Sequence, residues 1–174
     1  TMLGIGGSVA TPKGGIRGEV IVVDSFDSLD KVKDKVKGKI VLYNVPFTTY
    51  GETVQYRYDG PNYAAKYGAI ASLIRSVGTG SMDTPHTGTM GSYTGLKKIP
   101  HAAISMEDAM MISRLYKRGQ KIVVKLNMEA KFVSDRWSRN VIAELIGSTY
   151  PDQVVVIGGH IDSWDVGQGA HDDG

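Results

Sequence analysis

The sequence predicts a mixed α/β protein in which a β-rich domain with peripheral helices precedes the first strands of a second, incomplete α/β domain. Short runs of β-branched and aliphatic residues alternate with segments of helical periodicity over residues 13–128. Glycine accounts for 22 of the 174 residues, which favours many tight turns over a helical bundle. Beyond Arg139 every formally charged residue is acidic, and this change of character indicates a second domain.

The first domain is expected to contain five strands and three helices. The strands are short apolar runs, at residues 19–23, 39–43, 69–74, 99–104 and 121–126. Asp27 is expected to cap a first helix that ends at Gly38. Pro61 suits the first position of a second helix, and Ser105 is expected to cap a third helix that closes at Gly119.

Two segments of this domain are expected to lack regular structure. Residues 47–60 are aromatic and polar without a long apolar run, which suits an extended excursion. Residues 75–98 contain five glycines and one proline and are predicted to form a long loop, because these residues punctuate regular structure. Loops of that length are usually functional or mobile.

The change after Arg139 sets the expected domain boundaries. We expect an N-terminal segment at 1–12, a first domain at 13–128, a crossing at 129–139 and a partial second domain at 140–174. Strands are predicted at 140–146 and 153–158. Both ends of the chain have loop-like sequence, so we expect the chain to be a piece of a longer protein.

Composition excludes several classes of function. The net charge is +2 without a long basic run, so no nucleic-acid partner is expected. No apolar run approaches the roughly 18–20 residues of a membrane span. The chain has no cysteine, which excludes disulfides and thiolate metal ligands but leaves the cellular compartment open.

Residues 158–174 carry the chemistry. A histidine follows the predicted strand 153–158 by two glycines, and a second histidine and four acids lie within the same 14 residues: His160, Asp162, Asp165, His171, Asp172 and Asp173. Imidazole and carboxylate ligands suit zinc, cobalt or manganese. The acids do not follow the spacing of a calcium loop. The residues alone leave two interpretations open, a metal site and a hydrophilic loop.

The string HIDSWDVGQGAHDDG resembles the first metal motif of the carboxypeptidase Q branch of the co-catalytic zinc aminopeptidase family. The upstream strings GKIVLYN, VQYR, ASLIRSV, PHTG and KIP resemble the protease-associated domain that these enzymes carry as an insertion. The resemblance therefore implies that residues 13–128 are a protease-associated domain and that residues 140–174 begin a zinc-peptidase domain.

The resemblance also implies roles for individual residues. His160 would bind one zinc ion of a two-zinc site, and Asp172 would bridge both ions. Asp162 would accept a hydrogen bond from His160 and fix its tautomer. Asp173 would shape the turn, with a cis peptide bond between Asp172 and Asp173.

Other residues are assigned smaller roles or none. Trp164 and His86 are expected at the rim of a substrate pocket, and the loop at 75–98 would overhang the active site as a lid. His171 and His101 are expected to take no direct part. The general base and the remaining ligands would lie downstream of this chain, so the piece alone is not expected to be catalytically competent.

The function that the resemblance implies is hydrolysis of small peptides, dipeptides especially, by metal-activated water in a secreted or lysosomal exopeptidase. The intact protein is expected to be a homodimer. The alternative is a protease-associated binding or lid module of a receptor-like relative that has lost its metals. A carbohydrate-binding β-domain is a third interpretation, supported only by the glycine and tyrosine content.

Overall fold

The computed structural model describes residues 1–93, 95–170 and 172–173. The chain divides into two units, Thr1–Val133 and Ser134–Gly174, and each unit is described by itself.

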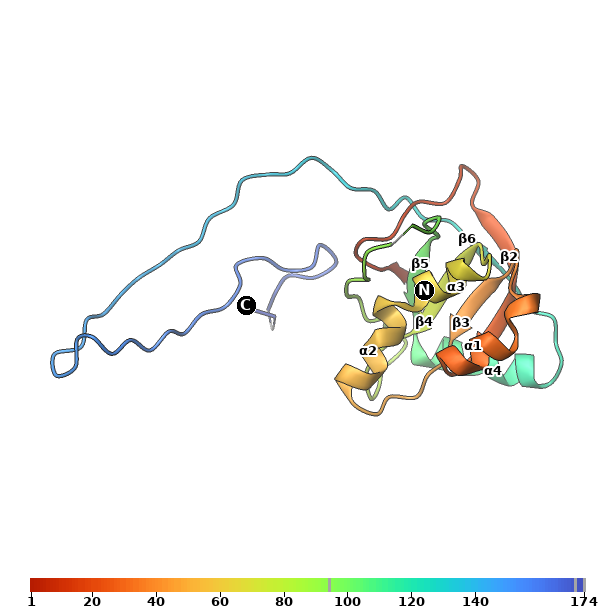
Figure 1. Ribbon diagram of the computed structural model, residues 1–174, viewed down its shortest axis with the longest axis horizontal. Helices are drawn as coiled ribbons and strands as arrows, with labels where there is room; N and C mark the ends of the chain where they lie inside the picture. The colour runs from red at the N-terminus through yellow and green to blue at the C-terminus, as the bar shows by residue number, and fades with distance from the viewer. Residues whose placement is uncertain (94, 171, 174) are drawn as a thin grey trace. The chain divides into compact units, whose positions relative to one another are not determined.

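The first unit is built on one six-stranded sheet with the order β1-β5-β4-β3-β2-β6 (Figure 1). Its strands are β1 (Met2–Gly4), β2 (Ile16–Val23), β3 (Ile40–Tyr43), β4 (Ala71–Arg75), β5 (His101–Ile104) and β6 (Val123–Leu126). The four central strands β2, β3, β4 and β5 are parallel, and β1 and β6 pair antiparallel at the two edges. The predicted α/β class is confirmed, and each of the five strands predicted in this domain is present.

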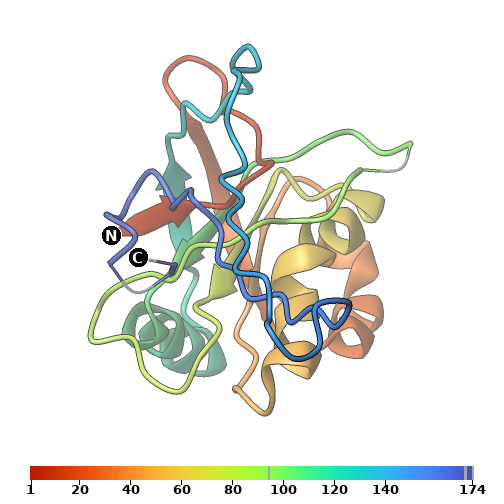
Figure 2. The same ribbon diagram turned by 90° about the vertical axis from the view of Figure 1, so that its left-hand side faces the viewer.

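Helices cover both faces of the sheet. They are α1 (Phe26–Lys31), α2 (Tyr50–Tyr58), α3 (Gly60–Lys66) and α4 (Met106–Lys117), with a short 3-10 turn at Lys33–Lys35. Figure 2 shows the teal helix α4 on one side of the strands and the orange and yellow helices α1 to α3 on the other. Parallel strands covered on both faces read as continuous apolar runs, which is why they were visible in the sequence.

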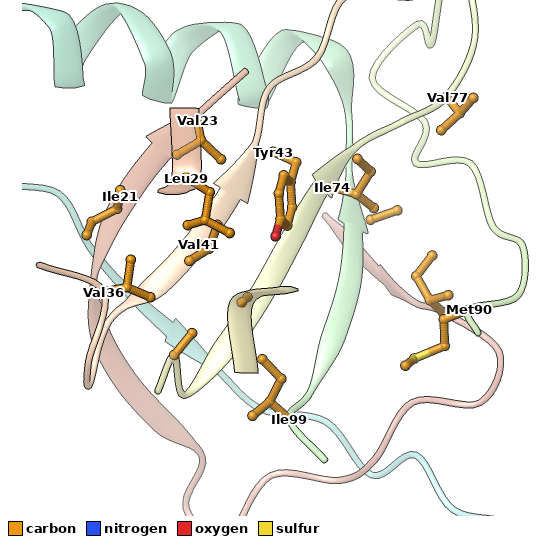
Figure 3. Close-up of a cluster of buried hydrophobic side chains, with 14 residues drawn as sticks. Ile21, Val23, Leu29, Val36, Val41, Tyr43, Ile74, Val77, Met90 and Ile99 are labelled. Atoms are coloured by element: carbon orange, nitrogen blue, oxygen red, sulfur yellow. The ribbon is translucent and has the colours of Figure 1, made fainter. Parts of the chain in front are cut away.

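Each face of the sheet has its own hydrophobic cluster. Alternate residues of the strands point to opposite faces, so Val41 joins the cluster under α1 and α3, whereas Ile40 joins the cluster under α4. Figure 3 shows the first cluster, with Tyr43 lying among aliphatic side chains. The Tyr43 hydroxyl donates a hydrogen bond of 2.7 Å to the carbonyl of Gly60, which ties β3 to the start of α3.

Three predictions for the first unit are wrong. The first helix was expected to end at Gly38, but it ends at Lys31 and is followed by the 3-10 turn. The first helix is capped by Ser25, not by Asp27, because Ser25 and Ser28 satisfy each other's backbone N–H groups in a capping box. Residues 47–60 are not extended, since they contain helix α2, capped by the Thr49 hydroxyl. The buried face of α2 carries Thr53 and Arg57 in place of apolar residues, so the helical period was hidden.

The predicted loop between β4 and β5 is present: the described residues of 76–100 contain no helix or strand. Its middle is nevertheless fixed to other parts of the unit. The amide of Gly6 donates to the carbonyl of Gly88, and the amide of Met90 donates to the carbonyl of Gly6, at 2.8 and 3.0 Å. The Arg57 side chain donates to the carbonyls of Thr87 and Thr89.

The second unit corrects another expectation. Residues 134–170 and 172–173 contain turns but no helix or strand, so the strands predicted at 140–146 and 153–158 are absent. The apolar side chains of both segments are exposed, with Leu145 98% accessible. A buried strand needs hydrogen-bonding neighbours and covered faces, and the described residues of this unit supply neither.

No helix among the described residues is both long enough and apolar enough to cross a membrane.

Candidate metal centre

Three side chains of the second unit converge on one point. The described residues bring ligand atoms of His160, Asp172 and Asp173 within 4.8 Å of one another. His160 Nε2 lies 2.8 Å from Asp172 Oδ1 and 3.3 Å from Asp173 Oδ2. One imidazole nitrogen and two carboxylate oxygens form a donor set that suits zinc and has no thiolate.

The tautomer of His160 is set by its other nitrogen. His160 Nδ1 lies 2.6 Å from the backbone carbonyl oxygen of Asp162 and 3.2 Å from Asp162 Oδ1. Both atoms are acceptors, so Nδ1 carries the proton and donates it. With Nδ1 as a donor, Nε2 donates to Asp172 Oδ1 when the ring is protonated, and in the neutral ring Nε2 has a lone pair for a metal ion.

Asp173 helps to hold this geometry. Its Oδ2 accepts a hydrogen bond of 3.1 Å from the backbone amide of His160. A Cβ at Gly159 would lie only 3.3 Å from the same oxygen, so a side chain there would press on the turn. The Asp172–Asp173 peptide bond is cis, as the resemblance implies.

The carboxylates also change the protonation of His160. The hydrogen bond to Asp172 is the largest cause that raises the pKa of His160, followed by the hydrogen bond to the Asp162 carbonyl. A histidine must be neutral to bind a metal, so metal affinity at this site should fall as the pH falls.

The cluster lies beside an open hollow of about 980 Å³ within the same unit. Its lining includes His160, Asp162 and Asp173 together with Arg139 and Gln168. Trp164, predicted at a substrate rim, is not among the lining residues and is 42% exposed. Its carbonyl closes a turn with the amide of Gly167.

The other sequence-predicted histidines have different surroundings. His86 belongs to the first unit, where its amide donates to Ser76 Oγ and its Nδ1 lies 3.1 Å from the Val77 carbonyl oxygen. Its role at a substrate rim stays a prediction. His101 is fully buried. The prediction for His171 lies outside the described residues.

Sequence reasoning missed one part of the cluster. Asp173 was expected to shape the turn, and its carboxylate also lies within 4.8 Å of ligand atoms of His160 and Asp172. The adjacent pair of aspartates was a weak signal, because neighbouring side chains usually point apart.

Comparisons with known proteins relate the segment that holds this cluster to a peptidase family. The family model for peptidase family M28 matches residues 140–174, the segment that holds the cluster. Carboxypeptidase Q from Mus musculus is 54% identical over 173 residues, which are 99% of this chain and 37% of that protein. Carboxypeptidase Q from Xenopus laevis is 56% identical with the same coverage. The chain therefore spans little more than a third of the length of these relatives.

Solved structures give the same result. A peptidase M28 precursor from Shewanella amazonensis superposes with a TM-score of 0.88 at 36% identity, over 97% of this chain and 40% of that chain. A zinc aminopeptidase from Bacillus subtilis has a TM-score of 0.51 at 22% identity, over 72% of this chain and 26% of its own, and supports the fold alone.

The chain is part of the M28 family of peptidases. Within that family it belongs to the carboxypeptidase Q branch.

Proposed function

We propose that residues 1–174 are part of a zinc-dependent exopeptidase that hydrolyses small peptides, dipeptides especially. The observation that carries the proposal is the convergence of His160, Asp172 and Asp173 in the segment that matches the family model. Bound zinc ions in such a site polarise the scissile carbonyl and lower the pKa of a water molecule.

The residues of this chain have separate tasks in the proposed site. His160 would supply Nε2 to one zinc ion, and Asp172 would supply its carboxylate to both ions of a two-zinc centre. Asp162 accepts a hydrogen bond from Nδ1–H, which keeps the proton on Nδ1 and leaves Nε2 available to bind zinc. Asp173 holds the backbone of His160 in place through its carboxylate.

The 174 residues alone should not catalyse hydrolysis. Among the described residues the cluster offers three side chains for two ions, whereas each zinc in a peptidase normally has at least three protein ligands. We propose that the general base and the remaining ligands belong to other parts of the intact peptidase. The chain by itself should therefore bind zinc weakly.

Calorimetric titration of residues 1–174 with zinc chloride tests the assignment of ligands. We expect a dissociation constant above the micromolar range and loss of the binding heat in His160→Ala. Asp165→Asn is the matched control, because Asp165 is an exposed acid of the same segment outside the cluster. Submicromolar stoichiometric binding that survives His160→Ala would show that the ligands are misassigned.

Activity must be measured on the intact peptidase. His160→Ala and Asp172→Asn should each lower zinc content and dipeptide hydrolysis together, because both side chains bind the same centre. An intact protein that carries no zinc after reconstitution and cleaves no peptide would instead support the receptor-like alternative.

The remaining assignments complete the proposal. Residues 13–128 act as the protease-associated domain, and the loop at 75–98, with His86, and the side chain of Trp164 border the substrate. The intact protein is a homodimer in a secreted or lysosomal location. The similarity to carboxypeptidase Q over nearly the whole chain supports the assignment to a peptidase of this branch, from which these statements are extended.

A further inference from the structure

The guanidinium of Arg57 is buried in the first unit without an acidic partner. Arg57 is only 8% exposed. Its Nε donates to the Thr89 carbonyl at 3.3 Å, its Nη1 to the Thr87 carbonyl at 3.2 Å, and its Nη2 to the Tyr50 hydroxyl at 2.9 Å. All three acceptors are neutral, and no carboxylate of the described residues forms an ion pair with Arg57.

This arrangement leaves hydrogen-bond donors without acceptors. A guanidinium has five N–H groups, and the hydrogen bonds among the described residues use three of them. Tyr50 Oη accepts from Arg57, so its own proton is directed elsewhere, and no described residue accepts it. Two N–H groups and one O–H group therefore lie close together beside a positive charge.

The guanidinium is packed tightly on one side and borders an exposed side chain on another. On one side the guanidinium packs so closely against Gly88 that an added Cβ would lie 2.2 Å from Arg57 Cζ. On another side the Tyr50 ring centroid lies 5.8 Å from Cζ. Tyr50 is 58% exposed, so solvent reaches this side chain.

We propose that Arg57 and Tyr50 form a binding site for a carboxylate group. A planar carboxylate matches the planar fork of a guanidinium and accepts several hydrogen bonds at once. Its negative charge would compensate a buried cation that is otherwise surrounded by neutral acceptors. The site lies in the first unit and does not depend on the metal centre.

Arg57 also fixes the loop through Thr87 and Thr89, and this structural role alone does not explain the site. It accounts for two of the N–H groups but leaves the charge uncompensated. The Tyr50 hydroxyl accepts from a third N–H group and brings no negative charge.

Titration of residues 1–174 with sodium acetate, followed by NMR at constant ionic strength and pH, tests the proposal. We expect saturable shifts of the Arg57 Nε–H signal and of the Gly88 amide, with an affinity in the millimolar range. Acetamide has nearly the same shape without the charge and should give no saturable shift. Tyr50→Phe should weaken acetate binding by about fivefold, the value of one hydrogen bond.

Two further variants complete the test. Arg57→Lys keeps the charge but loses the fork, so it should also weaken binding. Tyr63→Phe is the matched control, because Tyr63 is another partly exposed tyrosine of the same unit, and it should bind acetate as the wild type does. The proposal is overturned if acetamide reproduces the acetate shifts, if Tyr50→Phe binds acetate unchanged, or if inorganic phosphate binds and acetate does not.

Discussion

His101 should make the stability of the first unit depend on pH. Its side chain is fully buried on β5, with Nδ1 2.8 Å from Ser72 Oγ and Nε2 3.1 Å from the Arg57 carbonyl oxygen. The Nε2–H donates to that carbonyl, and Nδ1 accepts from the serine, so the ring is neutral. The pKa of His101 is lowered from 6.5 to about 4. Burial is the largest cause, and the positive charge of Arg57 acts in the same direction.

The sign of the effect follows from the direction of the shift. Between pH 6.5 and about 4 the unfolded chain binds a proton at His101 that the folded chain does not. The contribution of neutral His101 to the free energy of unfolding is therefore fully present above pH 6.5 and is lost as the pH falls. The pKa difference corresponds to a total loss of about 3 kcal/mol of unfolding free energy, of which about 2 kcal/mol is lost by pH 5.

Urea unfolding of the wild type and His101→Gln at several pH values from 8 to 5 measures this loss. Glutamine retains an N–H donor for the Arg57 carbonyl but cannot be protonated, so its stability should fall less steeply with pH. His86→Gln is the matched control for removing a histidine from the same unit. If the wild type and His101→Gln lose unfolding free energy in parallel from pH 8 to pH 5, the reasoning is refuted.

Three other predictions concern the stability of the first unit and the proteolysis of the segment that follows it. Tyr43→Phe should lower the free energy of unfolding by about 1–2 kcal/mol in urea, because the Gly60 carbonyl loses a buried donor, and unchanged stability would contradict this. Gly88→Ala should cost about 1–3 kcal/mol in thermal or urea unfolding because its Cβ would overlap Arg57, whereas Gly80→Ala, with nothing within 4 Å, should cost much less. Trypsin should cut first at Lys131, Arg136 or Arg139, which are all exposed, and protection of this segment would argue against a crossing between domains.

The sheet of the first unit could be predicted because each central strand is an apolar run covered on both faces. Val41 and Leu42 are adjacent and both fully buried, one under each layer of helices. β1 could not be predicted in this way. It has three residues, too few for any period to be visible, and it is defined by its pairing with β5.

The candidate metal centre was predictable in part. The motif around His160 and Asp172 indicated both residues, and the structure brings them to 2.8 Å. The acceptor for His160 Nδ1 at the shortest distance is the backbone carbonyl of Asp162, and its carboxylate lies farther away. Residue types carry no signal for a backbone acceptor, so this detail depends on the fold of the turn.

The contacts of the loop at 75–98 limit which of its residues could move if the loop acts as a lid. The segment around Gly88 is held by Gly6 on one side and by Arg57 on the other, so these residues cannot move without breaking backbone hydrogen bonds. Displacing them would also leave the Arg57 guanidinium buried without its carbonyl acceptors, which is costly. Any motion that admits a substrate is therefore expected at the exposed turn around Met82 or at Leu96, Lys97 and Lys98, where the loop is exposed. A proline or glycine substitution at those positions would test gating without disturbing the fixed middle of the loop.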